Sequence, residues 1–110
     1  MRARSLTYAP AALADIAEIH AYLSARASAS VADRVIARLR AAIRARREIP
    51  LLSPPRPEYG EHCRLLIAGS YAIYYNAAPS GMEVLRILHV ARDRDSIMSG
   101  VQENAEPFAA

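Results

Sequence analysis

The segment from Cys63 to Asp95 constrains the fold more than any other part of the chain, because its pattern is that of short strands joined by tight turns. Gly69-Ser70 forms the first turn, and the stretch from Ala77 to Gly81 forms the second. The predicted strands are Cys63–Ala68, Tyr71–Asn76 and Met82–Val90. The last strand is apolar on both faces, which suits a central strand covered on each side. The segment therefore predicts a meander with a buried final strand.

A short strand and an amphipathic helix are predicted before this meander. Ser5–Tyr8 alternates weakly and ends just before Pro10, which favours a helix start. The helix runs from Ala11 to about Arg26, and its apolar side chains share one face at spacings of three or four residues: Leu13, Ile16, Ile19 and Leu23. Asp15 and Glu18 are predicted to lie on the other side, where the early turns of a helix favour acidic groups.

A second amphipathic helix is predicted from about Val31 to Glu48. The Ser28-Ala29-Ser30 stretch can cap its beginning, and Pro50 marks its end. Its arginines are predicted to lie on solvated faces: Arg34, Arg38, Arg40 and Arg44. Only a short link separates the two helices, so they should pack as an antiparallel hairpin. The predicted fold class is α+β, with an N-terminal strand and a helical hairpin packed on a small, mainly antiparallel sheet.

Size and composition limit the classes of protein that this chain can belong to. At 110 residues it can form one two-layer domain, predicted at residues 1–99, with a flexible tail at 100–110. All 14 basic residues are arginine, and the net charge of +3 permits an acidic partner without requiring one. The single cysteine excludes an internal disulfide, and no motif predicts a metal site or a cofactor. No run resembles a signal peptide or a membrane span, so we expect a soluble, cytoplasmic protein.

Four pieces of the chain, taken in order, are similar to one family. They are a Tyr8-x-Pro10 entry followed by the helix from Asp15 to Leu23, a long helix ending before Pro50, a strand centred on Arg64 and Leu65 followed by Gly69 to Tyr75, and the stretch from Leu85 to Asp93. Together they resemble the ParE/RelE superfamily of toxins from bacterial toxin–antitoxin pairs. The resemblance extends from about Leu6 to Ser96.

The resemblance implies one of two activities. RelE-like members cut messenger RNA on the ribosome with basic residues and often a tyrosine or histidine near the C-terminus, whereas ParE-like members block DNA gyrase. No tyrosine follows Arg94, and the central loop contains no lysine. Both observations favour the ParE-like branch. The resemblance then implies a toxin that inhibits gyrase by binding, without covalent chemistry of its own, and that forms a hetero-oligomer with a ParD-like antitoxin. It implies no sequence-specific nucleic-acid binding by the toxin alone.

Two sets of site residues follow from these expectations. We expect the target to contact a cluster at and after the last strand: Arg86, His89, Arg92 and Arg94. We expect the antitoxin to lay an amphipathic helix, with strand addition at a sheet edge as a further possibility, on the apolar stripe of the first helix: Leu13, Ile16, Ile19 and Leu23. Arg86 alternates with Val84, Leu88 and Val90 and is therefore predicted to share their apolar face. It therefore needs either a carboxylate partner or a face that a binding partner covers.

Two alternatives stay open from the sequence. An mRNA endonuclease would centre on His89, Arg64, Arg86 and Arg92, with His89 transferring a proton and the arginines holding the phosphate. A second acid or base is missing from this set, and the favoured interpretation of His89 is an ordinary strand histidine packed against the core. The other alternative is a diverged member that binds its antitoxin and has lost toxicity.

Overall fold

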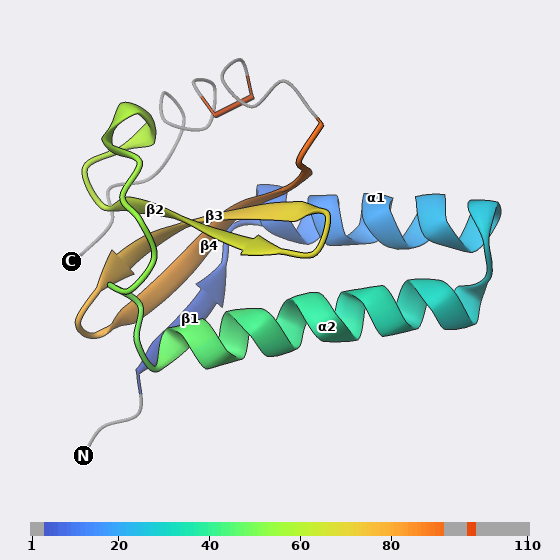
Figure 1. Cartoon of the computed structure of the whole chain (residues 1–110), viewed down its shortest axis with the longest axis horizontal. Coiled ribbons are helices and arrows are strands. Elements are labelled where there is room, and N and C mark those ends of the chain that lie inside the picture. The colour runs from blue at the N-terminus through green and yellow to red at the C-terminus, as the bar shows by residue number, and fades with distance from the viewer. Residues whose placement is uncertain (1–3, 92–96, 99–110) are drawn as a thin grey trace.

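The computed structural model describes residues 4–91 and 97–98, and it has a four-stranded sheet with two helices on one face (Figure 1). The helices are α1 (Pro10–Arg26) and α2 (Ala29–Arg47). The strands are β1 (Ser5–Tyr8), β2 (Cys63–Ala68), β3 (Tyr71–Ala78) and β4 (Gly81–His89). Their order in the sheet is β1-β4-β3-β2. The predicted α+β fold is confirmed, and the predicted tail at 100–110 lies outside the described residues.

Local sequence signals explain where the helices begin. Pro10 occupies the first helical position of α1, where its missing N–H would have no helical partner in any case. Ser28 caps α2, because its hydroxyl oxygen accepts a hydrogen bond from the N–H of Val31 at 3.1 Å. The helices form a hairpin whose connected ends extend past the turn between β2 and β3 (Figure 1). Neither described helix has the length and apolarity that crossing a bilayer requires.

The sheet is buried on both faces. Under the helices, Ile16, Leu39 and Ile43 pack with side chains of β3 and β4, including Ile73 and Ile87. A second cluster covers the opposite face and consists of Cys63, Leu65, Ala72, Tyr74, Leu85, Leu88 and Met98. The loop before β2, which includes the short 3₁₀ helix η1 (Pro57–Tyr59), packs there through the ring of Tyr59, set edge-to-face on Tyr74. The doubly apolar pattern of the last strand is therefore that of a central strand.

A β-bulge in β4 corrects one prediction about Arg86. Tyr74 pairs with Arg86 and Tyr75 pairs with Val84, so Leu85 is the extra residue between them. The bulge breaks the alternation, because Val84 packs on the helix side and Leu88 packs on the opposite side. The prediction that Arg86 shares one face with both of them is therefore wrong.

Asp15 of α1 holds the bulged strand through three hydrogen bonds. Its carboxylate accepts two from the Arg86 guanidinium, both at 2.7 Å, and one from the backbone N–H of Ile87 at 2.9 Å. The side chain of Asp15 is only 7% exposed and that of Arg86 is 19% exposed. Hydrogen bonding to Asp15 raises the pKa of Arg86. The prediction that Asp15 lies on the solvent side of the first helix is thus wrong, and the carboxylate partner that Arg86 needed is identified.

Replacing Asp15 should destabilise the protein far more than replacing an exposed aspartate. Asp15→Ala leaves a largely buried guanidinium and a backbone N–H without their acceptor, so we expect the free energy of unfolding to fall by about 3 kcal/mol. The matched control is Asp33→Ala, which removes the exposed ion pair between α2 and His20 and should cost less than about 1 kcal/mol. Urea denaturation checks both values. Equal losses for the two variants would contradict the structural role of the Asp15 carboxylate.

Burial of Cys63 makes the stability depend on pH in alkaline solution. Its side chain is buried in the cluster on the far face of the sheet, and burial raises the thiol pKa from 9.0 to about 12. Below pH 9 the thiol is protonated in both the folded and the unfolded chain, so it does not make the stability depend on pH. Between pH 9 and 12 it ionises only in the unfolded chain, so stability should fall as pH rises. Denaturation at pH 8 and pH 10.5 should show a smaller fall in the free energy of unfolding for Cys63→Ala than for the wild type. An equal fall in the two proteins would contradict this assignment.

Candidate functional site

A hollow of about 640 Å³ lies between the helical hairpin and the ends of β3 and β4. Its lining residues are Glu18, Ile19, Tyr22, Leu23, Val35, Ser70, Tyr71, His89 and Ala91. Ile19 and Leu23 belong to the predicted apolar stripe of the first helix and lie in its wall. The other two members of that stripe are placed differently, because Ile16 is buried in the core and Leu13 is 49% exposed outside the hollow.

The sheet side of the hollow consists of an aromatic pair. Tyr71 and His89 face each other across β3 and β4, and their rings meet edge-to-face at 5.6 Å. The Nδ1 atom of His89 accepts a hydrogen bond from the N–H of Ala91 at 3.2 Å, so the neutral ring carries its proton on Nε2. Burial raises the pKa of the Tyr71 phenol further above its ordinary value, so the phenol is a hydrogen-bond donor at neutral pH. This wall thus offers two ring surfaces and two hydrogen-bond donors.

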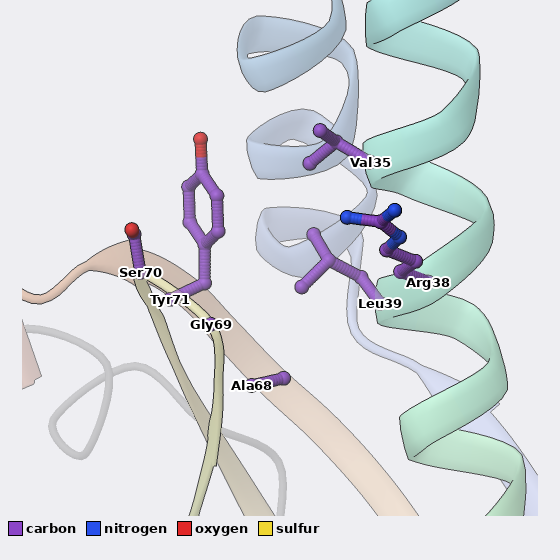
Figure 2. A pocket seen from close by; sticks show the side chains of 7 residues that line it. All are labelled: Val35, Arg38, Leu39, Ala68, Gly69, Ser70 and Tyr71. Carbon is purple, nitrogen blue, oxygen red and sulfur yellow. The ribbon is translucent and has the colours of Figure 1, made fainter.

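A smaller hollow of about 270 Å³ adjoins the first one (Figure 2). Its lining residues are Val35, Arg38, Leu39, Ala68, Gly69, Ser70 and Tyr71. Val35, Ser70 and Tyr71 line both hollows, so the two adjoin, and we call them together the hairpin groove. Gly69 has a φ of +58°, and this left-handed conformation turns the chain tightly enough to bring Ser70 and Tyr71 opposite α2.

The arginines of the alternative nuclease set do not gather around His89. Arg86 is engaged by Asp15. The Nη1 atom of Arg64 donates to the carbonyl oxygens of Leu51 and Ser53 at 2.9 and 2.7 Å. Arg64 and His89 pair with positions of β3 that are four residues apart, which separates them by about 13 Å along the sheet. Arg92 and Arg94 lie outside the described residues.

Reasoning from sequence missed Asp15 and the contribution of the strand ends to the site. Asp15 directly precedes Ile16 and is four residues before Ile19, so it borders the apolar face of α1. That position indicates a carboxylate that can point toward the sheet. Tyr71 and Val35 line the same hollows because of how the helices cross the sheet. No local sequence pattern encodes that crossing. Among the residues that the structure describes, no three His, Cys, Asp or Glu side chains gather as a metal site.

Comparison with known proteins identifies the family. The family described as ParE toxin of type II toxin-antitoxin system, parDE, matches residues 6–94. A solved structure titled as the chromosomal ParDE TA system from P. aeruginosa has a similar fold, with a TM-score of 0.69 and 17% sequence identity. That match covers 80% of this chain and 97% of the other. No curated protein matches by sequence. The match over most of the chain and the hairpin-on-sheet fold show that this chain belongs to the ParE toxin family of type II toxin–antitoxin systems.

Proposed function

We propose that this ParE-family toxin binds and inhibits DNA gyrase in the cytoplasm, and that a ParD-like antitoxin neutralises it by forming a hetero-oligomer. Membership of the family supports a toxin role. One observation supports inhibition by binding over RNA cleavage. Asp15 engages Arg86, and loop carbonyl oxygens engage Arg64, so neither arginine is free to hold a phosphate.

Cleavage of RNA without a metal needs a base, an acid and positive charge on the phosphate. The Nε and Nη2 groups of Arg86 both face the Asp15 carboxylate, which neutralises the charge of Arg86. Two backbone oxygens hold the Nη1 group of Arg64. Within the described residues, His89 therefore has neither arginine beside it. This arrangement supports inhibition by binding, in which His89 acts as a contact and transfers no proton.

The contacts that we propose for the target and for the antitoxin are assigned from the exposure of the side chains. His89 is exposed at the end of β4, and the chain continues from there to Arg92 and Arg94. We therefore assign target contact to this end of the sheet, with Arg86 holding the strand in place beneath it. For the antitoxin we assign the hairpin groove, where Ile19 and Leu23 line the wall and Leu13 extends the apolar surface along α1. The P. aeruginosa structure, titled as a ParDE system, supports a ParD-like partner.

Pulse labelling tests the target directly. After induction in a bacterial host without antitoxin, thymidine incorporation should fall within the first minutes and before leucine incorporation, because blocked gyrase stops replication first. Co-expression of the antitoxin should restore both. An earlier fall in protein synthesis would contradict the gyrase proposal and would support an mRNA endonuclease. No fall in either, with folded toxin present, would support a diverged member without toxicity.

The His89→Ala variant separates contact from catalysis. If His89 only contacts the target, the variant should still arrest growth, with potency reduced by less than about tenfold, which corresponds to about 1.4 kcal/mol of binding. The control is His20→Ala, which removes a partly exposed histidine that pairs with Asp33 of α2 and does not line either hollow. Growth curves at graded induction give the potency, and circular dichroism verifies folding. A folded His89→Ala protein with no toxicity at any induction level would contradict the binding mechanism.

A further inference from the structure

Arginine side chains gather where β1 runs beside the half of α2 that leads into the following loop (Figure 1). Arg40, Arg44 and Arg47 recur at i, i+4 and i+7, so they share one side of α2. Arg4 directly precedes β1. Its Nη1 atom lies 3.9 Å from Oε2 of Glu48, and the Nε atom of Arg47 lies 3.5 Å from Oε1 of the same carboxylate. We call these four arginines the basic strip, and none of them lines the hairpin groove.

The basic strip carries more charge than its surroundings compensate. Glu48 is the acid that the structure places against it, and this carboxylate is 63% exposed and shared between two of the arginines. The side chain of Arg40 lies over the ring of Tyr8 at 5.2 Å, and neither Arg40 nor Arg44 forms a side-chain hydrogen bond or ion pair with a described residue. Together the four arginines and Glu48 have a net charge of +3, which equals the formal net charge of the whole chain. The excess positive charge of this protein is therefore concentrated in the strip.

Helix stability accounts for only part of this arrangement. Cations in the last turn of a helix interact favourably with its dipole, which explains Arg44 and Arg47. Arg40 stands about two turns before the end of α2, and Arg4 lies outside the helix. Like charges four residues apart on one helix repel each other, so the pair of Arg40 and Arg44 opposes helix stability. An anion bound along the strip would relieve this repulsion.

The residues around the strip favour a phosphate backbone over an acidic protein as the bound anion. A protein interface needs an apolar centre with charges at its rim, whereas the exposed residues of α2 next to the strip include only the small side chains of Ala37 and Ala41. Guanidinium groups pair with phosphate oxygens through parallel hydrogen bonds. From Arg40 to Arg47 the strip is about 10 Å long. One strand of duplex DNA presents about three phosphates over that length.

We propose that the basic strip binds the phosphate backbone of duplex DNA without regard to sequence, and that in the cell this DNA is the segment that the toxin's target holds. The source of the DNA rests on the proposed function, because an inhibitor bound to gyrase lies beside the DNA on which gyrase works. The strip lies apart from the hairpin groove assigned to the antitoxin and from the end of β4 assigned to the target protein. It therefore adds a third contact surface to the toxin.

Fluorescence anisotropy with a short labelled DNA duplex tests the inference on the purified wild-type toxin and its variants. We expect binding at low salt, and log Kd should rise with log salt concentration with a slope of about 3. Arg44→Gln removes one phosphate contact, so it should raise Kd about fivefold and reduce the slope by about one. The matched control is Arg34→Gln, which removes an exposed arginine of α2 outside the strip and should leave both quantities unchanged. Circular dichroism verifies that each variant is folded.

Equal effects of Arg44→Gln and Arg34→Gln, a strong preference for one duplex sequence, or no binding of the wild type at low salt would overturn the inference and leave the proposed function standing.

A supercoiling assay with purified gyrase separates the inference from the proposed function. Half inhibition should require about fivefold more Arg44→Gln toxin than wild type, matching the loss of DNA affinity, while binding of gyrase without DNA should not change. Unchanged inhibition by the folded variant, or weaker binding of gyrase without DNA, would overturn the assignment of the strip to target-held DNA. A wild-type toxin that binds DNA through the strip and does not inhibit gyrase would contradict the proposed function and leave DNA binding by the strip in place.

Discussion

The three hydrogen bonds of the Asp15 carboxylate join the helical hairpin to the centre of the sheet. The bulge at Leu85 displaces the ladder of β4 locally, and the N–H of Ile87 finds its acceptor on α1. The same carboxylate neutralises Arg86, a charge that could not remain unpaired between two layers. The Asp15 side chain thus accepts the hydrogen bond that the bulged strand offers, compensates the buried charge of Arg86 and fixes how α1 lies on the sheet.

The pairing of Asp15 with Arg86 also determines which side chains the end of β4 can offer to a partner. Because Arg86 is engaged in holding β4, the described end of that strand presents His89 beside the ring of Tyr71 rather than beside a free Arg86 guanidinium. Such a surface is suited to contacts with a protein. The position of α1 further determines the width of the hairpin groove, since Ile19 and Leu23 stand one and two turns after Asp15. The ion pair and the groove are therefore parts of one arrangement.

The sequence was sufficient for the features that depend on local pattern. Ser5–Tyr8 and Cys63–Ala68 were predicted with the bounds that the structure has, and the cap of α2, Ser28, lies within the Ser28-Ala29-Ser30 stretch that was predicted to hold it. The errors concern contacts between distant segments. Asp15 and Arg86 are 71 residues apart, and the bulge depends on how β4 pairs with β3, so neither is visible in a window of a few residues. The four antitoxin candidates on α1 shared a predicted stripe, yet Ile16 is buried and Leu13 is exposed, because the buried face of the helix is centred on Ala12, Asp15 and Ile16 and Leu13 lies at its margin.

The open groove is a consequence of the same geometry. The hairpin extends past the turn between β2 and β3, so the connected half of each helix has no strand beneath it (Figure 1). Apolar side chains in that half, such as Tyr22 at 56% exposure, remain in contact with water in the isolated chain. Burying them offers a partner a substantial hydrophobic gain. Because any apolar segment could gain from that surface, discrimination between partners has to come from the polar side chains that line the groove, which include Glu18, Arg38 and His89.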